Sequence, residues 1–159
     1  MTHILRFVGI VLCVLLYLAP AAAQDRHDLY CHPTPKFEET YNARSRVLLG
    51  SDRDRRLGFV AGLTRELFDD PAPQRYAIFA KGSDVEKLII VALDDEVFST
   101  MFRARAVLAA LTSLVQASPL FAELGVQRRF TCYDLAKLLV FKQITVSDGR
   151  NWSHRINLM

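Results

Sequence analysis

The sequence is poor in the residues that mark fibrous, low-complexity or repetitive chains. Its 159 residues include only 7 glycines and 6 prolines, which excludes a collagen-like or low-complexity protein. Only one apolar run is free of charged residues, so a protein that crosses a membrane several times is also excluded. The composition, 51% hydrophobic and 23% charged, is instead typical of one globular domain.

The common motifs of catalysis and nucleotide binding are missing as well. The chain has no G-x-S-x-G, no H-E-x-x-H, no P-loop and no G-x-G-x-x-G. Its formal net charge is only +3 and it has no nucleic-acid-binding motif, so nucleic acid is not an expected partner. We expect no cofactor, and the motifs alone predict no enzymatic activity.

The single long apolar run has the order of a secretory signal peptide. Arg6 supplies a positive charge, Phe7 to Ala19 is apolar, and Pro20 precedes the three alanines that end at Ala23. A helix that spans a bilayer needs about 20 apolar residues, so an uncleaved anchor is the weaker alternative. We expect cleavage after Ala23, a bacterial periplasmic or secreted location, and a mature chain 24–159 without a membrane span.

Two cysteines, Cys31 and Cys132, follow the expected leader. In an oxidising compartment such a pair predicts one disulfide. Closing a loop of about 100 residues would stabilise the fold by on the order of 4–5 kcal/mol. A reactive thiol or a metal-binding pair is the alternative, although the chain has no C-x-x-C spacing.

Hydrophobic periodicity predicts one domain after the leader, with helices as one of its two layers. Residues 24–37 contain two prolines and little periodicity, which favours an extended arm. Apolar residues at helical spacing predict helices at residues 51–70, 94–117, 118–125 and from 131 onward. Ser51 with Asp54 and Thr131 with Asp134 match capping boxes. Gly58 and Gly62 share a face of the first helix, which predicts close packing against a neighbour.

Two β-hairpins are also predicted. Residues 76–80 and 88–93 flank a turn that contains Gly82. Residues 144–147 and 152–158 flank Asp148-Gly149, a favoured two-residue turn. The expected fold class is therefore α+β: a two-layer sandwich of about four mostly antiparallel strands, with three to four helices packed on the sheet.

His154 is the leading candidate for catalysis. It alternates with Trp152 and Ile156 in the last expected strand, so its imidazole should lie on the apolar face of the sheet. Beside Asp148 or Cys132 it could act as a general base. The simpler interpretation is a hydrogen-bonded core histidine, and a disulfide-bonded Cys132 could not also be a nucleophile.

Two histidines near the expected mature N-terminus, His27 and His32, are weak candidates for binding a transition metal. Cleavage after Ala23 would place His27 fourth, whereas an amino-terminal copper or nickel site needs a histidine in third position. Oxidation of Cys31 would remove a further donor. We therefore predict no metal site.

A basic stretch after the arm is the leading candidate for binding a partner. With Trp152, its candidate binding residues are Arg44, Arg46, Arg53, Arg55 and Arg56, and Arg65 continues the stretch. Such a surface could bind an acidic lipid headgroup, an anionic glycan or an acidic protein. A solvated helix face with local ion pairs is the alternative.

These observations favour an exported, non-enzymatic binding or interaction module. Its partner would be another envelope protein or an anionic ligand. The alternative hypothesis is a small periplasmic hydrolase or transferase that uses His154 as general base.

Overall fold

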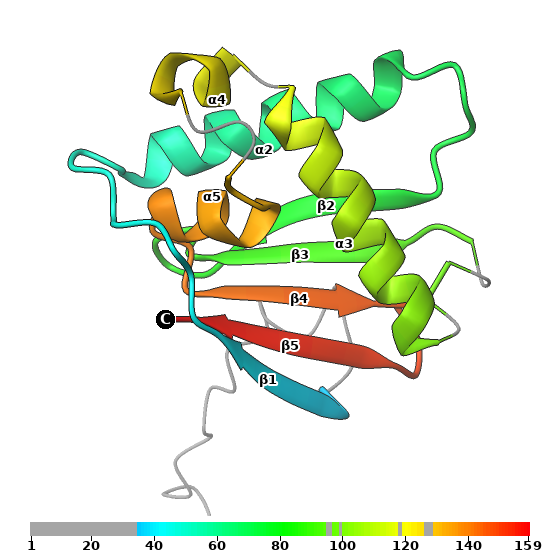
Figure 1. The fold of residues 1–159 in the computed structure, drawn as a ribbon. Coiled ribbons are helices and arrows are strands. Elements are labelled where there is room, and N and C mark those ends of the chain that lie inside the picture. Colours follow the sequence, from blue (N-terminus) through cyan, green and yellow to red (C-terminus); the bar gives the residue numbers. More distant parts are fainter. Residues whose placement is uncertain (1–34, 95–96, 99, 118, 126–128) are drawn as a thin grey trace, which may run out of the picture.

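A sheet and a layer of helices on one of its faces make up the fold (Figure 1). The computed structural model describes residues 35–159, apart from residues 95–96, 99, 118 and 126–128. The α+β class predicted from the sequence is confirmed. The expected leader, Cys31 and most of the expected arm lie outside the described residues.

The sheet has five strands and mixes parallel with antiparallel pairs. They are β1 (Phe37–Tyr41), β2 (Tyr76–Lys81), β3 (Lys87–Ala92), β4 (Gln143–Ser147) and β5 (Ser153–Leu158). Their order is β1-β5-β4-β3-β2. The two expected hairpins are present as the antiparallel pairs β2–β3 and β4–β5, whereas β3–β4 and β1–β5 are parallel.

The prediction of about four mostly antiparallel strands is therefore right only in part, because the described sheet has five strands and its pairs β1–β5 and β3–β4 are parallel. It missed β1, whose sequence FEETY is exposed at three of its five positions and so lacks a buried apolar face. It also missed the parallel pairs, because a parallel neighbour is joined through a long crossover and leaves no local signal in the sequence.

The helices are α2 (Arg53–Asp69), α3 (Met101–Gln116), α4 (Pro119–Leu124) and α5 (Cys132–Leu138). Figure 1 shows α3 crossing the sheet and α2 running along β2 at its edge. Alternate strand residues face this layer, because side chains of a strand point to opposite faces in turn. The joint core includes Ile78, Ile90, Val146 and Ile156 from the strands and Val60, Leu63, Leu108, Val115 and Leu135 from the helices.

Two of the expected helix starts are wrong. The N-cap of α2 is Asp52, whose carboxylate accepts the Arg55 N–H at 2.9 Å. The N-cap of α3 is Thr100, which accepts from Arg103 N, so this helix begins well after Asp94. Aspartate and threonine oxygens both satisfy free N–H groups at a helix start, so several nearby residues compete for the position.

Two expected helix boundaries are confirmed. Thr131 and Asp134 form the capping box of α5, and Cys132 is its first residue. Gly125 has a φ of 64° directly after α4, a backbone conformation that glycine adopts without a Cβ penalty.

The expected two-residue turn of the last hairpin is also wrong. Ser147 pairs with Ser153, so residues 148–152 join the strands. The Asp148 carboxylate accepts three backbone N–H groups, from Arg150, Asn151 and Trp152, at 2.8–2.9 Å. An aspartate side chain can hold a longer loop by such bonds, which a dipeptide rule does not anticipate.

The two glycines of α2 generate a prediction about stability. A Cβ at Gly58 or Gly62 would meet no atom within 4 Å, so the expected close packing at these positions is wrong. Gly58→Ala and Gly62→Ala should each raise the free energy of unfolding by about 0.5–1 kcal/mol, because alanine loses less backbone entropy in a helix.

Urea denaturation of the single variants would measure this effect. Gly82→Ala is the control with the opposite sign, because Gly82 has a φ of 100°, a backbone conformation that is strained for a residue with a Cβ. Destabilisation by Gly58→Ala would contradict the assignment of an open helix face.

Candidate functional site

His154 lies inside the fold, between the sheet and the helix layer. In β5 it faces Val146 on one side and Phe37 of β1 on the other. Its side chain is only 6% exposed. The prediction that this imidazole lies on the apolar face of the sheet matches its burial, and the burial leaves little room for a substrate.

The neighbours of His154 are aromatic rings and one carboxylate. Trp152 stacks on the imidazole with ring centroids 6.3 Å apart, and the Phe37 ring is tilted against it. Glu39 Oε1 lies 3.1 Å from His154 Nε2, and Glu39 Oε2 lies 3.6 Å from the Arg105 guanidinium of α3. Neither ring nitrogen of His154 has an aligned hydrogen bond, so Glu39 approaches the imidazole without orienting it.

The structure does not bring Asp148 to His154 as a catalytic partner. The Asp148 carboxylate is occupied by the loop of the last hairpin. Burial alone would raise the pKa of Asp148, but the backbone N–H groups of Trp152, Arg150 and Asn151 outweigh it and hold this pKa below its usual value. A carboxylate stabilised in this way is a poor proton acceptor.

Cys132 is a buried free thiol in the structure. Its Sγ donates to the Leu108 carbonyl at 3.4 Å. Burial raises the pKa of Cys132 to about 11, although a hydrogen bond with Thr112 works in the opposite direction. The thiol is therefore unsuited to nucleophilic attack at neutral pH. The disulfide with Cys31 stays a prediction, because Cys31 lies outside the described residues.

The candidate arginines occupy two adjoining places. Arg44 and Arg46 belong to the segment 42–52 between β1 and α2, and Arg53 and Arg55 lie in the first turn of α2. All four are exposed. Because the segment 42–52 is followed directly by α2, the closeness of these arginines in the sequence was sufficient to group them as one candidate binding site.

Arg56 differs from the other four because it is buried, with 5% exposure. Its guanidinium donates to the carbonyl of Asp84 and, at 3.3 Å, to the carbonyl of Leu139. Leu139 is the C-cap of α5, where the helix dipole favours a cation. Arg56 thus joins α2 to the β2–β3 turn and to α5, which is a structural role.

The segment 42–52 is held against the fold by hydrogen bonds at both ends. Ala43 N donates to Met159 O, and Arg44 N donates to Asp134 Oδ1 at 2.7 Å. Leu48 N donates to Leu138 O at 2.9 Å. These bonds keep the exposed arginines at a constant place relative to α5.

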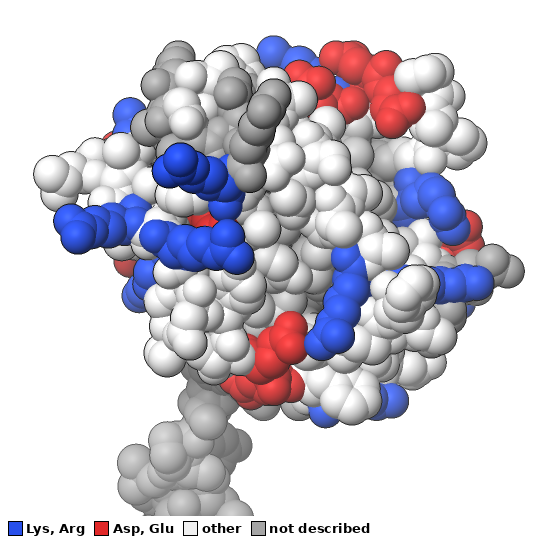
Figure 2. Space-filling view, in the orientation of Figure 1, with Lys and Arg blue, Asp and Glu red and all other residues white. Residues whose placement is uncertain are grey.

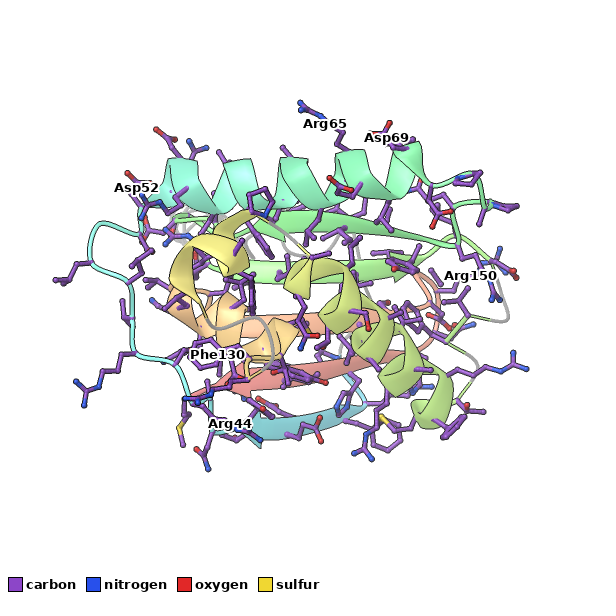
Figure 3. The ribbon with its side chains drawn as sticks, turned by 45° about the horizontal axis from the view of Figure 1, so that its top comes forward. Arg44, Asp52, Arg65, Asp69, Phe130 and Arg150 are labelled. Carbon is purple, nitrogen blue, oxygen red and sulfur yellow. The ribbon has the colours of Figure 1, made fainter. Side chains whose placement is uncertain are left out.

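The exposed arginines Arg44, Arg46, Arg53 and Arg55 are here called the basic surface. The segment 42–52 and the start of α2, which carry them, lie at one end of the molecule (Figure 1). Figure 2 shows Lys and Arg side chains gathered at the end where the segment 42–52 lies in Figure 1. Figure 3 places Arg44 and Asp52 at that end, and Arg150 at the opposite end. Arg65 projects from the outer side of α2, away from the sheet, and does not belong to the same surface. Trp152 packs on Phe98 and His154 and so is not part of it either.

A hollow of about 600 Å³ between β2 and α3 was missed from the sequence. Its lining residues are Arg75, Tyr76, Val97, Arg103, Ala106, Val107 and Ala110. Two cations over an apolar floor would suit a small organic anion. However, Arg75 already lies 3.7 Å from the Asp94 carboxylate, which offsets its charge. No local pattern could have found this hollow, because its residues come from separate elements.

The described residues show neither a membrane span nor a metal-binding group. None of the described helices has the length and apolarity that crossing a bilayer requires. Nor do three or more His, Cys, Asp or Glu side chains gather there in a way that could hold a metal ion. The weak metal candidates His27 and His32 lie outside the described residues.

Comparisons of the chain with protein-family profiles, with curated proteins and with solved structures gave no match.

The role of Arg56 can be tested by its effect on stability. Arg56→Met keeps the aliphatic stem but leaves the carbonyls of Asp84 and Leu139 without this donor. We expect the free energy of unfolding to fall by about 1–3 kcal/mol, the cost of unsatisfied buried polar groups. Arg53→Met, on the exposed first turn of the same helix, should change it by less than about 0.5 kcal/mol. Equal stability of the two variants in urea denaturation would refute the structural role.

The burial of Cys132 predicts slow thiol chemistry. In a Cys13→Ser/Cys31→Ser protein, where Cys132 is the only cysteine, a pKa of about 11 leaves few thiolates at pH 8. Labelling of the folded protein by a disulfide reagent should be roughly 100-fold slower than that of the urea-unfolded protein. The rate should keep rising with pH up to about 11. A rate that levels off near pH 8.5 would contradict the burial of the thiol.

Proposed function

We propose that this protein is an exported, non-enzymatic binding module that recognises an anionic partner through the basic surface. The basic surface consists of Arg44, Arg46, Arg53 and Arg55. The observation that carries the proposal is that these four arginines are exposed and lie in two consecutive segments, 42–52 and the first turn of α2, at one end of the fold. Export follows from the expected leader and is part of the proposal.

The positions of Arg53 and Arg55 support a binding role. Both lie in the first turn of α2, where the helix dipole disfavours cations. The acidic groups at this helix start are the N-cap Asp52 and Asp54 in the first turn. Helix stability therefore favours the two aspartates and not Arg53 and Arg55, which is consistent with a role of the arginines in binding an anion.

The positive charge at this end of the fold also supports electrostatic recognition. Several exposed cations attract an anionic partner through their summed field, even where they do not contact each other. The free energy gained should fall as salt screens the charges, with a Debye length of about 10 Å at 0.1 M ionic strength. Salt dependence is therefore the expected signature of this surface.

The surroundings of His154 argue against the alternative of a hydrolase or transferase. A general base must reach a proton of its substrate at hydrogen-bond distance. The His154 side chain is 6% exposed and lies against Trp152, Phe37 and Glu39, and none of these neighbours carries a hydroxyl or thiol that the imidazole could activate. The approach of Glu39 to the ring is the one observation that favours the alternative.

Charge reversal tests the proposed function. Arg44→Glu and Arg46→Glu should each weaken binding to a soluble polyanion such as heparin by about tenfold at low salt, because a favourable contact becomes repulsive. Arg65→Glu is the matched control, with the same change in net charge on the outer side of α2. Affinity chromatography and titration calorimetry would measure the difference.

Two results would contradict the proposal. One is equal weakening by all three variants, which would show that only the net charge matters. The other is hydrolysis or group transfer that is lost in His154→Ala while the fold persists.

A further inference from the structure

The segment that carries Arg44 and Arg46 also carries the most exposed apolar side chain among the large hydrophobic residues of the described chain. Leu49 is 93% exposed and Val47 is 48% exposed. Between them, Leu48 packs partly buried against the core. The inward Leu48 thus anchors the segment while Val47 and Leu49 face water on the other side.

The fold presents these two residues in a constrained way. Leu48 N donates to Leu138 O at 2.9 Å on one side, and Ser51 N donates back to Leu48 O at 3.1 Å. Gly50 has a φ of 78°, which lets the chain turn sharply directly after Leu49. A turn held in this way keeps Leu49 in water, although an unrestrained leucine would fold back onto apolar surface.

Arginines flank this apolar tip on both sides along the chain. Arg44 and Arg46 precede it, and Arg53 and Arg55 follow it, all of them exposed. The acidic residues close by are Asp52, whose carboxylate caps α2, and Asp54 in the next turn. The tip therefore combines apolar side chains with a surplus of positive charge, as Figure 2 shows for this end of the molecule.

We infer that this tip docks the protein on the surface of an anionic lipid bilayer. Leu49 and Val47 would enter the boundary between headgroups and acyl chains, while the arginines would remain at the level of the lipid phosphates. This inference deepens the proposed function, on which it rests, by naming its anionic partner. A bilayer suits the geometry because a projecting tip can penetrate a soft surface without a preformed pocket, whereas a protein partner would have to supply one.

The expected affinity for an anionic bilayer follows from two contributions, the charge of the arginines and the burial of Leu49. Each arginine near an anionic surface contributes roughly fivefold in affinity, and the contribution is screened by salt. Burial of the Leu49 side chain contributes at least about tenfold and depends much less on salt. Removing the arginines should therefore leave weak binding that depends little on salt. Removing Leu49 should leave weak binding that depends strongly on salt.

The test uses vesicles of phosphatidylcholine with or without phosphatidylglycerol, and the protein expressed with its own N-terminal segment and processed by the host. Leu49→Asp should reduce cosedimentation with the anionic vesicles at least tenfold. Phe102→Asp is the matched control, because Phe102 is 82% exposed, lies on α3 and undergoes the same change in charge. It should bind like the unchanged protein.

A fluorescence measurement separates penetration from electrostatic attraction alone. Leu49→Trp should show blue-shifted emission with anionic vesicles and quenching by brominated acyl chains, and Phe102→Trp should show neither. Trp152 contributes the same background in both variants. Quenching that is equal in the two variants would overturn the inference, and so would equal vesicle binding by Leu49→Asp and Phe102→Asp.

Failure of the inference and failure of the proposed function would look different. If Leu49→Asp keeps full binding to vesicles while Arg44→Glu loses binding to vesicles and heparin, the arginines bind anions without insertion, and only the bilayer-docking inference falls. If the unchanged protein binds heparin but not the vesicles, the partner is a soluble anion or an acidic protein, and again only this inference falls. If it binds neither, the proposed function falls as well.

Discussion

The buried carboxylate of Asp134 is the interaction on which the arrangement of this end of the protein depends. Asp134 has no exposed surface, and its two oxygens accept from Thr131 N, Thr131 Oγ1 and Arg44 N. A buried carboxylate is tolerated only where such donors replace water. One side chain therefore caps α5 and holds the segment 42–52, and the two positions are 90 residues apart in sequence.

Arg44 and Arg46, which lie in the segment 42–52, depend on that anchor for their positions. Ser45 Oγ donates to the backbone carbonyl of Asp134, and Leu48 N reaches Leu138 at the other end of α5. The segment thus follows the length of a short helix instead of forming a free loop. A surface held in this way loses little conformational entropy when it binds, which favours affinity at a given contact area.

His154 shows how the same fold buries a titratable side chain. The parallel pairing of β1 with β5 places Phe37 beside His154, and the loop of the last hairpin places Trp152 on its ring. Glu39 reaches the imidazole from β1, an edge strand. The imidazole thereby contacts both aromatic rings, and Glu39 lies close to the imidazole and to the Arg105 guanidinium of α3.

The sequence by itself determined the local elements: both hairpins, the capping box at Thr131, the end of α4 at Gly125 and the grouping of four exposed arginines. These follow from periodicity, caps and turn residues, whose energies depend on a few neighbouring positions. Only the tertiary structure decided the order of the strands, the burial of Arg56 against Leu139, the meeting of Glu39 with His154 and the exposure of Leu49. Each of these depends on contacts between distant segments, 83 residues apart for Arg56 and Leu139. Their energies arise only when the whole core packs, so no local pattern in the sequence records them.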